Sequence, residues 1–153
     1  MELKIRKSTI DDLEQIQKIA CRTIDINYRS FLGDKGVDWF IESGAAEQYL
    51  QDNIVDCWVL ESDNKIIAFC VCKGSLLDLI MVETEFHRKG YGSELLKYCE
   101  QVMFSYFEEI KLESFERNEK ANNFYRKHGW IQKEKIFDKA SNAYKLIFTK
   151  HNA

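Results

Sequence analysis

His87-Arg88-Lys89-Gly90-Tyr91-Gly92-Ser93 stands between the apolar run Leu79-Ile80-Met81-Val82 and Glu94-Leu95-Leu96. The pattern predicts a strand, a short polar turn and a helix whose start is marked by glycines. The first amides of a helix have no acceptor within the helix, and two glycines let a ligand approach them closely. The stretch therefore predicts an anion-binding turn, suited to a pyrophosphate, at residues 87–93.

The same patterns predict strands and helices in the rest of the chain, on both sides of this stretch. Apolar residues in alternation, or in short runs, predict strands, and a spacing of three and four predicts helices. Strands are expected at 3–7, 57–61, 65–73, 76–82, 110–114, 130–137 and 143–149. Helices are expected from 8 toward 28, near 37–41 after a break at Gly33-Asp34, and at 45–53, 90–107 and 120–128, with His151 in a frayed tail. This order predicts a mixed α/β sheet in one domain spanning 1–153.

Composition and charge exclude several classes of protein. The 153 residues are 45% hydrophobic and 31% charged, which is typical of a globular domain. The apolar run at 66–72 is too short to cross a membrane, and residues 1–6 lack a signal-peptide layout, so a cytoplasmic protein is expected. The net charge of −3 disfavours nucleic acid as the main partner.

The cysteines form no recognisable metal motif. Their number is odd, no pair has the Cys-x-x-Cys spacing, and Cys70 and Cys72 would share one face of a strand. Buried thiols in a reducing compartment, with no metal, are expected at all five positions: Cys21, Cys57, Cys70, Cys72 and Cys99.

Two segments carry a resemblance to a known family. The turn at 87–92 lacks the ending of a P-loop and the third glycine of a dinucleotide fingerprint. After Ile80-Met81-Val82 it resembles the acyl-coenzyme A loop of the GNAT superfamily of N-acetyltransferases, with His87 where that family has Gln or Arg. Asn118, Ala121, Phe124-Tyr125 and Gly129-Trp130 resemble a second signature of the same family.

This resemblance implies a fold and a co-substrate. The fold would be a single GNAT domain, α/β (α+β), with a mixed, mostly antiparallel sheet that is flanked by helices and splayed at the acyl-CoA site. Acetyl-CoA would be the co-substrate, with no metal. The binding residues would be Ile80, Met81, Val82, His87, Arg88, Lys89, Gly90, Tyr91, Gly92, Ser93, Asn118 and Asn123. For Asn118, capping of the following helix is an equally good interpretation.

The resemblance also assigns catalytic roles. Tyr125 would protonate the departing thiolate, and an amide near Met81-Val82 would meet the oxyanion. Asp78 or Glu113 would accept the proton of the amine. The alternatives are a core tyrosine at 125 and a solvent-facing aspartate at 78.

The implied activity is transfer of an acetyl group to a primary amine by direct attack in a ternary complex. The amine would belong to a small metabolite, an antibiotic or a protein, chosen by residues 28–42 and 138–142. The sequence leaves the oligomeric state undecided, with a homodimer as one possibility. The alternatives are a non-catalytic acyl-CoA-binding regulatory domain and a toxin-like aminoacyl-tRNA acetyltransferase, for which a net charge of −3 is unfavourable.

Overall fold

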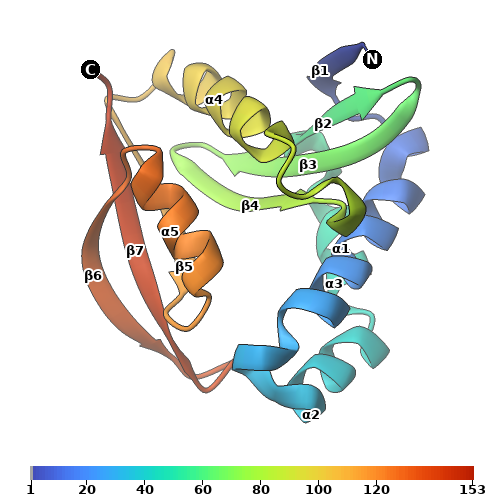
Figure 1. Ribbon diagram of the computed structural model, residues 1–153, viewed down its shortest axis with the longest axis vertical. Coiled ribbons are helices and arrows are strands. Elements are labelled where there is room, and N and C mark those ends of the chain that lie inside the picture. Colours follow the sequence, from blue (N-terminus) through green and yellow to red (C-terminus); the bar gives the residue numbers. More distant parts are fainter. Residues whose placement is uncertain (1) are drawn as a thin grey trace.

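One mixed sheet organises the protein. The computed structural model describes residues 2–153. Its strands lie in the order β1-β2-β3-β4-β5-β7-β6, and every neighbouring pair is antiparallel except β4 and β5, which are parallel (Figure 1). Their bounds are Leu3–Lys7, Cys57–Ser62, Lys65–Lys73, Leu76–Val82, Glu109–Phe115, Ile131–Asp138 and Ala143–His151 for β1 to β7. The predicted mixed, mostly antiparallel sheet is confirmed.

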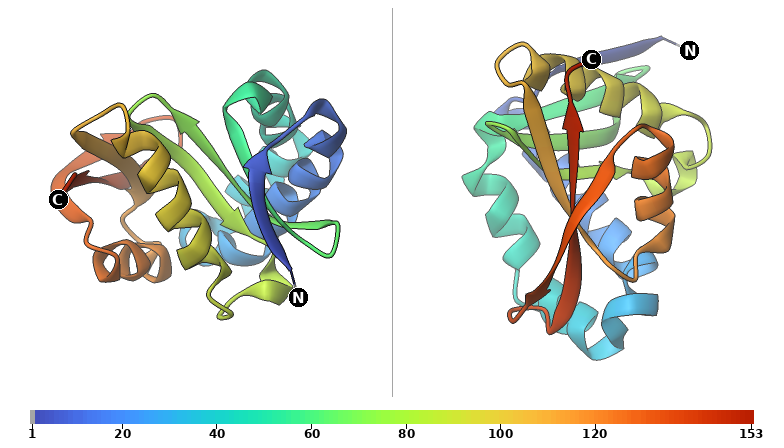
Figure 2. Two further views of the ribbon diagram at one scale, coloured as in Figure 1. Left: turned by 90° about the horizontal axis from the view of Figure 1, so that it is seen from above. Right: turned by 90° about the vertical axis from the view of Figure 1, so that its left-hand side faces the viewer.

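Helices cover both faces of the strands β2 to β4. From above, these strands run between α4 (Tyr91–Phe104) and the group α1–α3 (Figure 2). The bounds in that group are Leu13–Asn27, Arg29–Glu42 and Ala45–Asp52, and α5 (Glu119–Lys127) lies beside β5 and β7. Short 3₁₀ turns occupy Ile10–Asp12, Ile54–Asp56 and Thr84–Phe86. The predicted break near Gly33 is confirmed, since Gly33 has φ 80° inside α2.

The central strand explains the two-sided core. In β3 the run from Ile66 to Val71 is buried without interruption, because helices cover both of its faces. Phe69 and Val71 pack with α1 and α3, whereas Ile67 and Cys70 pack with α4. An apolar face on each side thus fixes which helix lies on which side of the sheet.

The parallel pair β4 and β5 is short and then diverges. It joins only Leu76 to Lys111 and Leu77 to Leu112. On its other edge β4 stays paired with β3, but the register passes from Leu77 directly to Leu79, so Asp78 sits in a β-bulge. The bulge bends β4 away from β5, and the splayed sheet predicted from the sequence is confirmed (Figure 1).

Several boundaries differ from the sequence prediction. Helix α4 ends at Phe104 and not at 107, and β6 begins after Trp130, which is buried. His151, expected in a frayed tail, ends β7 and pairs with Glu109 at 2.6 Å. A cross-strand partner orders this end of the chain. Among residues 2–153, no helix is long and apolar enough to cross a membrane.

Candidate functional site

The site begins at the edge of β4 that β5 leaves. Ile80, Met81 and Val82 pair with Cys70, Phe69 and Ala68 of β3 on one side. On the other side the pairing with β5 has ended at Leu77. A strand with one unpaired edge can accept an extended ligand as an additional strand. The backbone of Ile80, Met81 and Val82 therefore has one edge that β5 does not pair with.

The chain is anchored where it leaves β4. Glu83 is buried, accepts hydrogen bonds from the Arg22 guanidinium of α1, and donates its own amide to Ile67 at 2.8 Å. Arg22 lowers the pKa of Glu83 despite the burial of that carboxyl. His87, predicted to bind a ligand, donates from Nε2 to the Val82 carbonyl at 2.7 Å and so folds the turn back on the strand.

The turn then enters α4 through left-handed backbone. Arg88 has φ 64° and Gly90, the N-cap of α4, has φ 83°, a conformation that glycine adopts without strain. No side chain caps this helix end within the described chain. The amides of Gly92 and Ser93 lie in the first turn, where a helix offers no acceptor and its dipole attracts an anion. Arg88 and Lys89 are exposed beside it and add positive charge.

The second predicted motif packs directly on the first. A Cβ built on Gly92 would lie 3.5 Å from the Phe124 ring of α5 and 3.5 Å from Val82. His128 donates from Nδ1 to the Phe124 carbonyl at 2.8 Å. Its Nε2 is therefore left to accept from the Ser93 hydroxyl at 2.9 Å when the ring is neutral. The two motifs, about thirty residues apart in sequence, form one surface.

The two asparagines differ in their placement. Asn118 is the N-cap of α5, and its Oδ1 accepts from the Ala121 amide at 3.4 Å, so the capping interpretation is confirmed. Asn123 is exposed, and its Oδ1 accepts from Arg126. It lines a hollow with Arg126 and Gln132.

Tyr125 of α5 packs against the apolar core. Its ring packs at 5.9 Å from Phe148 and 6.4 Å from Trp130. Burial raises the pKa of Tyr125 well above its usual range, and Tyr28 is near enough to add to the effect. Burial raises the pKa of Tyr28 to about 12. Both phenols thus hold their protons at neutral pH.

Asp78 projects from the bulge at the point of divergence. It is half-buried, and its carboxylate accepts a hydrogen bond from the Tyr49 hydroxyl of α3. Burial, and next the Asp78 carboxylate, raise the pKa of Tyr49 far above its usual value. Sequence analysis missed Tyr49, because a partner 29 residues away on another element leaves no local pattern.

Glu113, the other carboxylate, is on the opposite strand. It pairs with Ile147 of β7 and is exposed, between the buried Leu112 and Ser114. Side-chain alternation puts Glu113 on the same face of β5 as Phe115, whose ring lies 5.6 Å from Phe31 and 6.3 Å from Tyr28. Both candidate bases therefore lie toward the helices α1–α3, and only Asp78 is at the bulge.

The two segments expected to choose a substrate approach each other. Phe31 of α2 and Asn142 of the β6–β7 turn line one small hollow with Phe115, Arg117 and Tyr144. Arg117 donates to the backbone carbonyls of Ser30 and Phe31 across it. Trp39, in the first of these segments, is 68% exposed.

Comparison with known sequences agrees with this geometry. The acetyltransferase (GNAT) domain family matches residues 53–132, just over half of the chain. Peptidyl-lysine N-acetyltransferase YiaC of Escherichia coli (strain K12) is 31% identical over 74 residues, which cover 48% of this chain and 48% of that protein. The match thus spans about half the length of this relative.

Solved structures share the fold over nearly the whole chain. The PaiA N-acetyltransferase of Thermoplasma acidophilum, solved in complex with coenzyme A, superposes with a TM-score of 0.83 at 21% identity. The superposition covers 99% of this chain and 100% of that one. A GCN5-related N-acetyltransferase of Rhodopseudomonas palustris gives a TM-score of 0.86 at 13% identity, over 99% and 97% of the two chains.

Proposed function

This chain belongs to the family of GNAT acetyltransferases, and from that premise we propose that it transfers the acetyl group of acetyl-CoA to a primary amine. One observation carries the proposal. The unpaired edge of β4 runs from the bulge at Asp78 to the turn before α4, and α5, which carries Tyr125, packs on that turn through Phe124. A thioester, an extended linker and a pyrophosphate would fit these three features in that order.

Different residues are proposed to bind different parts of acetyl-CoA. The amides of Gly92 and Ser93, with the dipole of α4, would hold the pyrophosphate, and Arg88 and Lys89 would add charge at its rim. The backbone of Ile80-Met81-Val82 would pair with the linker. His87 supports this indirectly, since its bond to Val82 fixes the turn against the strand.

The proposed acid is Tyr125. As the carbon–sulfur bond of the thioester breaks, Tyr125 would give its proton to the sulfur. Burial keeps this phenol protonated at neutral pH, and the packing of its ring against Phe148 and Trp130 fixes its position. A backbone amide near Met81 would stabilise the oxyanion that precedes this step.

The proposed base is Asp78, acting directly or through one water. An alkylammonium has a pKa of about 10.4 and must lose a proton before its nitrogen can attack the carbonyl carbon. Asp78 is favoured over Glu113 because it sits at the bulge and is fixed by Tyr49. The amine would approach from the side of α1–α3 and attack directly, with both substrates bound.

The acceptor is proposed to be a peptidyl lysine or a small amine. The name of the E. coli relative supports a peptidyl lysine. The hollow between Phe31 and Asn142 offers room for a lysine side chain or for a small amine. A cytoplasmic location is proposed with it. The exposed Ile131, Ile136 and Phe137 of the edge strand β6 would suit a homodimer.

Calorimetric titration with acetyl-CoA, followed by thiol release with a panel of amines and lysine peptides, tests the proposal. Micromolar binding and release with at least one amine are expected. Binding without release from any acceptor would favour a regulatory acyl-CoA-binding domain. Release only with aminoacyl-tRNA would favour the toxin-like reading, and no binding would overturn the assignment of the turn.

A further inference from the structure

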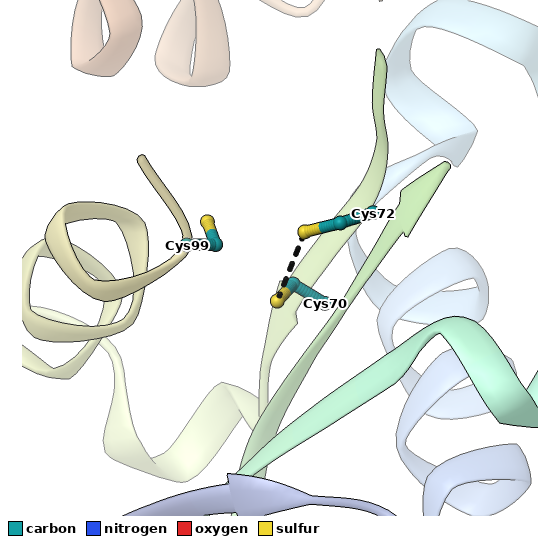
Figure 3. A group of neighbouring side chains, drawn as sticks. All are labelled: Cys70, Cys72 and Cys99. Carbon is teal, nitrogen blue, oxygen red and sulfur yellow. Dashed lines mark hydrogen bonds between the residues drawn. The ribbon is translucent and has the colours of Figure 1, made fainter. Parts of the chain in front are cut away.

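Three cysteines from two elements meet beneath the sheet. Cys70 and Cys72 of β3 turn their sulfurs toward Cys99 of α4 (Figure 3). The sulfurs of Cys70 and Cys72 are 3.9 Å apart, and all three lie within 4.8 Å of one another. Cys70 and Cys99 are fully buried and Cys72 is half-buried. The sequence predicted five buried thiols, with Cys70 and Cys72 on one face of a strand. The partial exposure of Cys72 and Cys21 corrects that prediction, and the approach of Cys99 was not predicted.

The spacing matches the ligand set of a thiolate-bound metal. Three sulfurs at about 2.3 Å from one ion are about 3.8 Å apart in a tetrahedral arrangement and about 4.0 Å apart in a plane. The observed 3.9 Å falls between these values, and a shift of under an ångström brings in the third sulfur. We propose that Cys70, Cys72 and Cys99 bind one soft metal ion, Cu(I) or Zn(II), as three thiolates.

Charges of both signs lie near the cluster. Lys7 of β1 is near Cys72, while Asp56 on the same side opposes ionisation. Glu100, beside Cys99, is already bound by Trp130 and Lys150.

Binding displaces protons and ties two elements together. Each S–H bond gives its proton to solvent as a metal–sulfur bond forms, so up to three protons are released per ion. The half-buried Cys72 provides an entry path. Cu(I) is satisfied by three sulfurs, whereas Zn(II) would add a fourth ligand such as water on that open side. An ion here would join α4, which begins at the proposed coenzyme turn, to β3.

Anaerobic competition titrations of the reduced full chain test the inference. One arm uses Zn(II) with a chromophoric chelator, and the other uses Cu(I) with a coloured Cu(I) chelator. One equivalent should bind in at least one arm, with proton release and a higher melting temperature. The arm that binds identifies the ion, and a sulfur-to-cobalt charge-transfer band after Co(II) loading would confirm thiolate ligation.

Substitutions separate the cluster from other thiols. Cys72→Ser should weaken binding at least about tenfold, because it removes a ligand at a half-exposed position where the fold tolerates serine. Cys99→Ala provides a second test on α4. Cys21→Ser, outside the cluster, should bind as the unchanged protein does. Failure of both metals to bind, or equal binding by Cys72→Ser, would overturn the inference, whatever the outcome with acetyl-CoA.

Discussion

The Tyr49 hydroxyl donates a hydrogen bond to the Asp78 carboxylate at the bulge where β4 parts from β5. The bond fixes one carboxylate oxygen toward α3 and leaves the other free to accept a proton. It joins the proposed base to a helix on the side from which the amine would approach. If Asp78 is the base, Tyr49 would position its carboxylate.

Asp78→Asn is expected to lower turnover about a hundredfold, because the amide cannot accept the proton of the amine. The affinity for acetyl-CoA should stay within about twofold. Thiol release and calorimetry measure the two quantities. Glu113→Gln is the matched control and should keep most of its activity. A larger loss in Glu113→Gln than in Asp78→Asn would assign the base to β5.

Tyr49→Phe should lower turnover less than Asp78→Asn does, since the carboxylate remains but is free to rotate. If Tyr49 acts through Asp78, the double variant should be no slower than Asp78→Asn alone. Single and double variants are compared by thiol release, with acetyl-CoA affinity as the check on folding. Additive losses would mean that Tyr49 has a separate role.

Tyr125→Phe should reduce turnover by about a hundredfold and leave acetyl-CoA binding nearly unchanged, because only the proton donor is removed from a ring that still packs on Phe148. Tyr106→Phe, at an 82% exposed position, is the control. Weaker binding with unchanged turnover would instead make Tyr125 a binding residue.

Gly92→Val should abolish detectable acetyl-CoA binding, because its side chain would extend toward Phe124 and Val82 and cover the first-turn amides. Gly36→Val, on an exposed turn of α2 with open space around the added atoms, should bind normally. Circular dichroism checks that both variants fold. If folded Gly92→Val binds acetyl-CoA normally, the pyrophosphate does not bind at this turn.

Arg22→Ala should destabilise the protein by about 1 kcal/mol at pH 7, a modest figure because Arg22 is half-exposed. The folded-state pKa of Glu83 is below its ordinary value of 4.5, so this stabilisation is present above that pH. It is lost as the pH falls through the lowered pKa.

Urea denaturation of both proteins at pH 7 and below pH 4 measures the difference. The gap between them should narrow in acid. Lys65→Ala, which breaks an exposed pair with Glu85, is the control and should cost under about 0.5 kcal/mol. A gap that is equal at both pH values would show that Arg22 acts through packing and not through charge.

Local sequence determined most of the elements and one half of the site. Periodicity located every strand to within one or two residues at most ends, since alternation and helical spacing are properties of neighbouring residues. Gly90 and Gly92 marked the turn before α4 for the same reason, because a left-handed N-cap and exposed amides are local features.

Tertiary structure alone decided which side chains meet. Asp78 and Glu113 were equivalent candidates in the sequence, and the bulge together with Tyr49 distinguishes them. Asn123 was grouped with the coenzyme site, and the packing of α5 places it beside Arg126 and Gln132 at the surface. The cysteines of β3 and α4 approached only when both packed in one core. Such contacts join residues tens of positions apart, and no local period encodes them.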